Sequence, residues 1–325
     1  MDYIILLSAA VLLAACFVTN KLYERNAGTS LEAGFTFNIM LGLLASMIFY
    51  FVGAFQTGGF KFYFTPYSMI MATVLTVLVV NNTLLGFRII KNGSVSVYTL
   101  FLMSGGMTVP YIYGILFLDE EFTVRRTIGI IVLIFAVALS SYSGKGKRIK
   151  LSSLLMCIAV FVSNGFVSVT SKLHQLEYQR FIDGIDGAYA SVDTTHFVML
   201  SGIAKIAVCG IVLGALLLWK YLRPKAQLPV PEVEETVSDE KKAGIPKNWL
   251  KLLLIIVSAA VLDSVAYFLQ LKGAENLPAT VLYPMVTGST IVFMPIAAFL
   301  AFREKPSKFI VISVILSFGA TLLFL

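Results

Sequence analysis

Long runs of apolar residues, separated by short polar segments, follow one another along the whole chain. A helix needs about 20 mostly apolar residues to cross a hydrocarbon layer about 30 Å thick. The runs are too continuous for barrel strands, in which apolar and polar positions alternate. The pattern predicts an all-α polytopic membrane protein with ten transmembrane helices, at Tyr3–Thr19, Phe35–Phe55, Tyr67–Phe87, Val95–Leu118, Thr127–Tyr142, Leu151–Val169, Phe197–Leu218, Leu250–Leu271, Ala279–Phe302 and Phe309–Leu325.

The composition excludes an ordinary water-soluble domain, because 58% of the 325 residues are apolar and only 13% are charged. Cys16, Cys157 and Cys209 all lie inside apolar runs. We therefore expect neither a disulfide framework nor a metal site, and His174 and His196 are the only two histidines. The net charge of +7 is typical of the excess of Lys and Arg in membrane-protein loops, and we expect no nucleic-acid partner.

Two polar segments interrupt the series of spans. Residues 174–195 predict a modest extramembrane insertion, and their Asp183-Gly184-Ile185-Asp186-Gly187 stretch lacks the remaining ligands of a calcium loop. Residues 223–248 contain four prolines and a run of mixed charges, which predicts a solvated linker without a packed core.

One long segment occurs twice. Lys91–Glu121 recurs, 183 residues later and without a gap, as Ala274–Glu304, so that Gly105 aligns with Gly288 and Glu121 with Glu304. A fixed internal period is the sequence sign of a duplicated architecture.

The rest of each half aligns in other registers. Lys21 aligns with Lys172 and Gly42 with Gly202, and the two insertions account for the differing offsets. We therefore divide the chain into two five-helix repeats, residues 1–145 and 146–325. Because five is odd, the second repeat must enter the membrane from the other side, and inverted repeats are a transporter architecture.

Several turn sequences carry a resemblance to a known family. They are Ile-Lys-Asn-Gly-Ser-Val-Ser at 90–96, the stretch from Leu271 to Pro284, Asp-Glu-Glu-Phe-Thr at 119–123 and Arg-Glu-Lys-Pro-Ser at 303–307. With the Ala/Gly-rich first and sixth helices, each ending at a lysine, they resemble the drug/metabolite transporter superfamily in its EamA-like branch. The resemblance implies secondary transport of small metabolites without an ATPase site. The chain indeed has no GxxxxGK[ST] phosphate loop.

Two ionisable residues lie deep inside predicted spans, where charges are costly and mark functional sites by default. Lys205 aligns with Ala45 and Asp263 aligns with Val80, so each charge breaks the internal symmetry. We expect one or both to face a central cavity and to bind a charged substrate group or carry a coupled proton. The alternatives are that Lys205 extends to the headgroups or that the two residues only pair.

Other polar positions in the spans are candidates to line the substrate path, although amides also join helices and tyrosines also anchor at the interface. They are Asn81, Asn82, Tyr98, Ser104, Thr108, Tyr283, Thr287 and Ser289. Small residues allow close helix approach, and prolines permit bending. On that basis we expect gating movements at Gly105, Pro110, Pro284, Gly288 and Pro295.

Taken together, the sequence predicts a secondary transporter of amino-acid, sugar or drug-like solutes that works by alternating access in the cell membrane. Its expected partners are a small-molecule substrate, membrane lipids and a coupling proton or ion, with no cofactor. No HExxH or GxSxG motif suggests an enzyme. A non-transporting receptor or scaffold built on the same fold is the alternative.

The two orientation criteria disagree. Connections after the odd-numbered spans carry 18 Lys and Arg residues and the other side carries six, which places both termini outside by the positive-inside rule. The family resemblance favours both termini inside.

Overall fold

The computed structural model describes residues 2–28, 30–92, 95–140, 151–222, 249–303 and 307–325. Within these ranges the chain forms ten α-helices and no strand. The helices are α1 (Asp2–Ala27), α2 (Leu31–Thr57), α3 (Pro66–Asn92), α4 (Val95–Phe117), α5 (Val124–Ser140), α6 (Leu151–Ile182), α7 (Thr194–Leu222), α8 (Trp249–Asn276), α9 (Ala279–Phe302) and α10 (Lys308–Leu322).

Local sequence sets several of the helix ends. Ser30 and Ser307 cap α2 and α10, since each side-chain oxygen accepts a hydrogen bond from the backbone N–H three residues later. Gly58 ends α2 with φ of 69°, a left-handed conformation that glycine adopts without steric cost. The Asp193 carboxylate accepts the backbone N–H of His196 and so caps α7.

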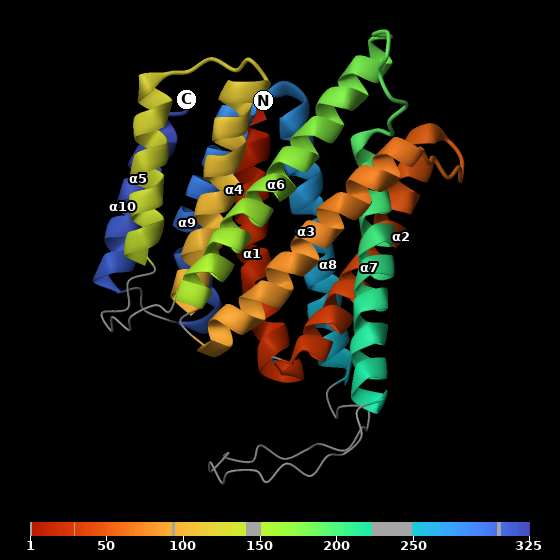
Figure 1. The fold of residues 1–325 in the computed structure, drawn as a ribbon, viewed down its shortest axis with the longest axis horizontal. Coiled ribbons are helices and arrows are strands. Elements are labelled where there is room, and N and C mark those ends of the chain that lie inside the picture. The colour runs from red at the N-terminus through yellow and green to blue at the C-terminus, as the bar shows by residue number, and fades with distance from the viewer. Residues whose placement is uncertain (1, 29, 93–94, 141–150, 223–248, 304–306) are drawn as a thin grey trace.

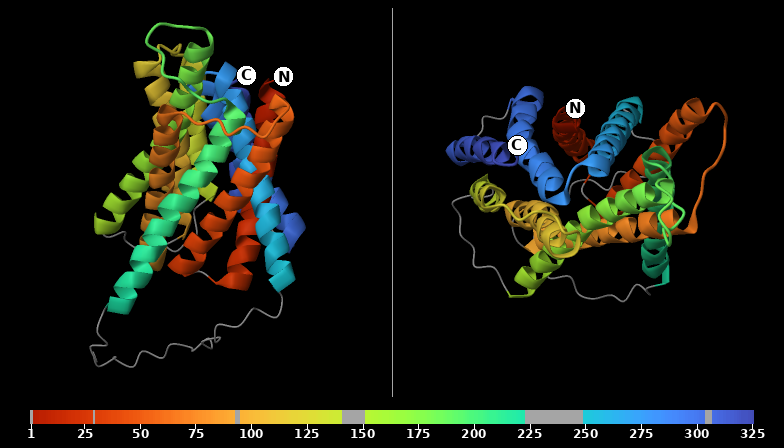
Figure 2. Two further views of the ribbon diagram at one scale, coloured as in Figure 1. Left: turned by 90° about the vertical axis from the view of Figure 1, so that its right-hand side faces the viewer. Right: turned by 90° about the horizontal axis from the view of Figure 1, so that it is seen from above.

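Both termini lie at one end of the helix bundle, together with the connections at 58–65, 118–123 and 183–193 (Figures 1 and 2). We call this the terminal end and the other the opposite end. In Figure 1, α1 starts at the terminal end, whereas α6 finishes there. Helices that the sequence aligns with each other thus run in opposite directions.

The two halves of the chain are packed against each other throughout. The main contacts join α2 to α7, α1 to α8 and α9, α3 to α6, α4 to α6 and α9, and α5 to α10. Figure 1 shows α5 and α10 at one edge of the bundle, with α2 and α7 at the other. The contacts follow the repeat. If each helix of the first half is replaced by its counterpart in the second half, and the reverse, the same set of contacts results; the contact of α1 with α8, for example, becomes the contact of α6 with α3.

The crossing of α2 and α7 depends on two glycines. A Cβ at Gly42 would lie 2.7 Å from the carbonyl oxygen of Gly202, and a Cβ at Gly202 would lie 2.6 Å from that of Gly42. These are the two glycines that the sequence aligns between the repeats. Their reciprocal contact means that equivalent points of the two halves meet at this crossing.

Eight of the described helices are long and apolar enough to cross a membrane. The other two, α5 with 17 residues and α10 with 15, are shorter. Large apolar side chains, among them Phe55, Ile211 and Leu300, are exposed on the outside of the molecule. The helices are therefore compatible with a multi-pass integral membrane protein.

The predicted helix ends differ most from the structure at α6. This helix continues past Val169 to Ile182, and α7 begins at Thr194, so that much of the segment 174–195 is helical; its extramembrane position stays a prediction. No proline or glycine interrupts α6 between Val169 and Ile182, and the Glu177 and Arg180 side chains pair at 3.0 Å along this extension. The predicted linker 223–248 lies outside the described residues.

Candidate functional site

The two charges that the sequence singled out lie side by side in the structure. Lys205 near the middle of α7 and Asp263 in the middle of α8 form an ion pair, with 3.5 Å between Nζ and Oδ2. Their side chains are 21% and 37% exposed, so the pair is in contact with open space inside the bundle. The thiol of Cys16, on α1, lies 4.0 Å from the other oxygen of Asp263.

A cavity of about 300 Å³ extends from this ion pair toward the opposite end. We call it the opposite-side cavity. Its polar lining includes Glu24, Asn38 and Thr83, as well as Lys205 and Asp263. Next to these groups the rings of Tyr23 and Phe37 stack with their centroids 4.1 Å apart.

A second cavity of about 200 Å³ extends from the same ion pair toward the terminal end. We call it the terminal-side cavity. Ser201, Tyr267 and Gln270 line it, again together with Lys205 and Asp263. The ion pair therefore lies where the two cavities meet.

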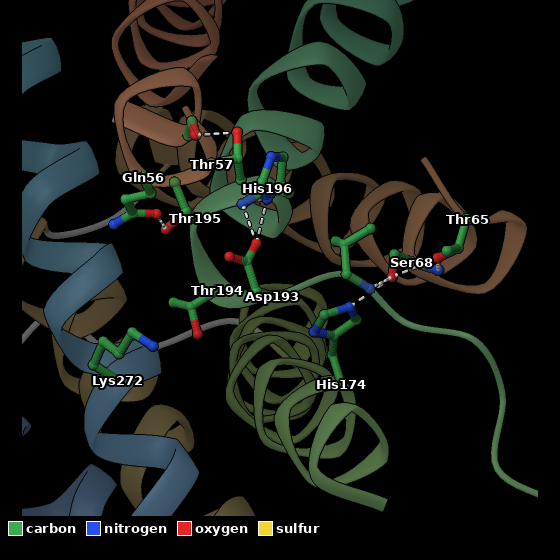
Figure 3. Close-up of polar contacts among 12 residues, drawn as sticks. Gln56, Thr57, Thr65, Ser68, His174, Asp193, Thr194, Thr195, His196 and Lys272 are labelled. Atoms are coloured by element: carbon green, nitrogen blue, oxygen red, sulfur yellow. Dashed lines mark hydrogen bonds and ion pairs between the residues drawn. The ribbon is translucent and has the colours of Figure 1, made fainter. Parts of the chain in front are cut away.

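A polar network closes the bundle beyond the terminal-side cavity (Figure 3). The Ser68 hydroxyl of α3 lies 2.9 Å from Nε2 of His174 on α6 and accepts the backbone N–H of Val192 at 3.0 Å. Thr195 of α7 donates to the Gln56 side chain of α2 at 3.0 Å. These bonds join the first half of the chain to the second.

The same network includes an ionisable group in the loop before α7. Asp193 accepts hydrogen bonds from the backbone N–H of His196 at 2.9 Å and lies 2.5 Å from Nδ1 of its ring. Burial raises the pKa of Asp193, but the hydrogen bonds and charge of His196 outweigh burial and hold that pKa below its usual value.

Two further charges stabilise helix ends at the α8–α9 turn. Nζ of Lys172 donates to the carbonyls of Ala274 and Leu277 at 2.6 and 2.7 Å, at the C-terminus of α8. The Glu120 carboxylate accepts the N–H groups of Ala279 and Thr280 at 2.7 and 2.8 Å, at the N-terminus of α9. Each charge has the sign that the adjacent helix dipole favours.

The amides and one tyrosine of the predicted substrate path join helices in this structure. Asn81 donates to Ser163 of α6, and Asn82 donates to Asn164 of α6, each at 3.3 Å. The Tyr98 hydroxyl lies 3.4 Å from the carbonyl of Asn82. None of the three lines the two cavities at the ion pair.

The predicted polar positions on α4 and α9 also lie away from the ion pair. Ser104 is buried, and neither its hydroxyl nor that of Thr108 has a hydrogen-bond partner among the described residues. Tyr283 is 2% exposed and donates to the carbonyl of Ser168 at 2.5 Å. Thr287 is half-buried and Ser289 is buried, both on α9.

The predicted gating residues lie at close helix contacts or inside helices. A Cβ at Gly105 would lie 2.1 Å from the carbonyl oxygen of Phe161 on α6, and one at Gly288 would lie 2.5 Å from the hydroxyl of Thr321 on α10. Pro110 lies within α4, and Pro284 and Pro295 lie within α9. The glycines thus allow close packing here, and gating at these positions stays a prediction.

Sequence reasoning missed several residues of the site. Asn38, Ser201 and Gln270 line the cavities but are ordinary polar residues in apolar helices. The role of Lys172 was also missed, because the helix was expected to end near it. Across the described residues there is no group of three or more His, Cys, Asp or Glu side chains that would hold a metal ion.

The chain matches no protein-family model, and no curated protein matches it. Among the 28 chains of solved structures that match is one described as "Crystal structure of protein". It is 12% identical, has a TM-score of 0.67, and the match covers 97% of this chain and 95% of that one. At this identity the likeness shows a shared fold alone.

Proposed function

We propose that this protein is a secondary transporter of small solutes that works by alternating access, with Lys205 and Asp263 as the charged groups that the solute or a coupled proton meets. One observation carries the proposal. The ion pair is shared by two cavities that extend toward opposite ends of the bundle. A purely structural ion pair has no need of open space on both sides.

The proposal includes ten spans arranged as two inverted five-helix repeats, residues 1–145 and 146–325. Three observations support it: the opposite directions of α1 and α6, the packing pattern that survives exchange of the halves, and the reciprocal contact of Gly42 and Gly202. In inverted-repeat transporters the site lies between the halves near the midplane. The resemblance of the turn sequences to the EamA-like branch agrees with this architecture.

The paired charges suit a transport cycle. As a pair they are neutral, which lowers the cost of placing either charge inside the membrane. A solute with a charged group forms an ion pair with Lys205 or Asp263 in place of that residue's present partner. The hydroxyl and amide groups of Ser201, Gln270 and Asn38 then provide further polar contacts on the two sides.

Solute flux into proteoliposomes tests the proposal. Solutes are first selected by a thermal-stabilisation screen of the purified protein with amino acids, sugars, nucleotides and organic cations, since a ligand of the folded state raises Tm. We expect Asp263→Asn and Lys205→Met each to lower flux of the selected solute at least tenfold. Lys220→Met is the control, because Lys220 pairs with Glu32 between α7 and α2 on the exposed surface.

Wild-type flux and unchanged pH dependence in both site variants would exclude the assigned role of the pair. Solute binding without any flux in the wild type would instead favour a membrane receptor that uses this fold.

A further inference from the structure

A compact hydrogen-bonded cluster lies between the terminal-side cavity and the terminal end of the bundle. The Thr194 hydroxyl of α7 contacts Oε1 of Gln175 on α6 at 3.0 Å and also hydrogen bonds to the Glu275 carboxylate of α8. Lys272 pairs with the same carboxylate at 2.8 Å. Thr194 and Gln175 are completely buried. The cluster therefore joins three helices, with Thr194 and Gln175 shielded from solvent and Glu275 and Lys272 partly exposed.

This cluster lies directly beyond the cavity. Val198, one helical turn after Thr194, lines the terminal-side cavity, and so does Gln270 of α8, just over one turn before Glu275. Figure 3 shows Thr194 beside the neighbouring polar contacts of Thr195, Asp193 and Lys272. Separation of α6, α7 and α8 at Thr194 would extend the cavity to the terminal end.

The aligned positions of the other half have the opposite environment. In the alignment of α1 with α6, which pairs Lys21 with Lys172, Gln175 corresponds to Glu24. In the alignment of α2 with α7, which pairs Gly42 with Gly202, Thr194 corresponds to Gly34. Glu24 is exposed, and both Glu24 and Gly34 line the opposite-side cavity. Equivalent positions are thus buried against each other at the terminal end, whereas at the opposite end they line a cavity, with α1 and α2 still joined by the Tyr23 hydroxyl, which donates to the carbonyl of Ala33 at 3.1 Å.

We infer that Gln175, Thr194 and Glu275 form the terminal-side gate, and that the structure represents the conformation that is closed there and open at the opposite end. This inference rests on the proposed alternating access. When the gate opens, the face around Glu24 and Gly34 closes. Hydrogen bonds suit this role, because the net contribution of each to stability is small compared with that of the packed helices. A gate held by so few of them opens without unfolding the bundle.

Cysteine labelling in detergent tests the gate, since the reagent then reaches both ends of the protein. Cys16, Cys157 and Cys209 are first replaced by alanine. A single cysteine is then introduced by Gln270→Cys in the terminal-side cavity or by Asn38→Cys in the opposite-side cavity, and its rate of reaction with a charged maleimide is measured. In each background Thr194→Val removes the hydroxyl while keeping the size of the side chain.

With Thr194→Val we expect position 270 to react about fivefold faster, the shift that loss of about one hydrogen bond produces. Position 38 should react more slowly. Thr194→Ser retains the hydroxyl and should restore both rates. The matched control is Thr73→Val, because the Thr73 hydroxyl donates within its own helix, to the carbonyl of Met69 at 2.8 Å.

Unchanged rates at both positions would overturn the inference, and so would a rise at both, which would indicate loosened packing. The labelling requires no solute, so it separates this inference from the proposed function. Reciprocal rates in a protein without flux would support the gate and exclude transport. Flux with unchanged rates would support transport and exclude this gate.

Discussion

Charged residues inside the bundle occupy two different environments, which exposure and hydrogen-bond partners distinguish at the level of single residues. Lys205 and Asp263 are in contact with two cavities and have each other as charged partners. Lys172 is 4% exposed and donates to two backbone carbonyls at the C-terminus of α8. The Lys205–Asp263 pair faces open space, whereas Lys172 hydrogen bonds to the backbone of a neighbouring helix.

This distinction predicts opposite outcomes for two Lys→Met substitutions. Lys172→Met leaves two carbonyls without their donor, and we expect it to lower the free energy of unfolding by about 2–3 kcal/mol. Lys205→Met should lower flux but change stability less, because its side chain is partly solvated. Denaturation of both variants in detergent, with the exposed Lys61→Met as control, compares them. Equal losses of stability would refute the distinction.

At the level of helices, the crossing of α2 and α7 is limited by backbone contact. A Cβ at Gly202 would lie 2.4 Å from the hydroxyl of Ser46 and 2.6 Å from the carbonyl oxygen of Gly42, and backbone cannot move aside as a side chain does. We expect Gly202→Ala to lower the free energy of unfolding by about 1–3 kcal/mol through overpacking.

Gly214→Ala, on the same helix, is the matched control. A Cβ there meets no atom within 4 Å. This substitution should raise stability by about 0.5–1 kcal/mol, because alanine favours the helix over glycine. The two changes therefore have opposite signs, and a similar effect of both on Tm would show that the crossing tolerates a wider separation.

The start of α7 carries a pH-dependent contribution to stability. The pKa of Asp193 is lowered in the folded protein, so its stabilisation is complete above the ordinary value of 3.8 and is lost as the pH falls through the folded value. Asp193→Asn keeps a capping side chain but removes the charge, which is worth about 0.3–1 kcal/mol at a helix N-terminus. We expect the variant to melt below the wild type at pH 6, and the difference to disappear as the pH falls through the lowered pKa of Asp193. A difference in Tm that persists at low pH would show that the variant is less stable because it lacks one carboxylate oxygen, and not because it lacks the charge.

For the whole molecule, hydropathy located all ten helices, because continuous apolar runs depend little on tertiary context. It also identified Lys205 and Asp263, since a charge in a span is conspicuous. It did not predict that Asn81, Tyr98, Ser104 or Thr287 lie away from the cavities. Helices that are apolar on all sides do not indicate which face turns inward. The extension of α6 was missed because a polar helix end resembles a loop in composition.

The shortest helices provide the decisive test of the ten-span arrangement. If α10 crosses the membrane, the exposed Leu325 lies on the same side as the N-terminus, as the common position of the termini in Figure 1 implies. If α10 stays at the surface where α9 ends, Leu325 lies on the side of Asn26, at the other end of α1.

Single cysteines introduced by Asp2→Cys, Asn26→Cys and Leu325→Cys, labelled in intact cells with an impermeant reagent, separate these arrangements. We expect positions 2 and 325 to react and position 26 to be protected, because the odd-numbered helices finish at the opposite end, the connections that follow them in the sequence carry 18 Lys and Arg residues, and basic connections favour the cytoplasm. Labelling of position 325 together with position 26 would show that the chain has fewer than ten spans and would exclude the inverted-repeat symmetry that the proposed alternating access requires.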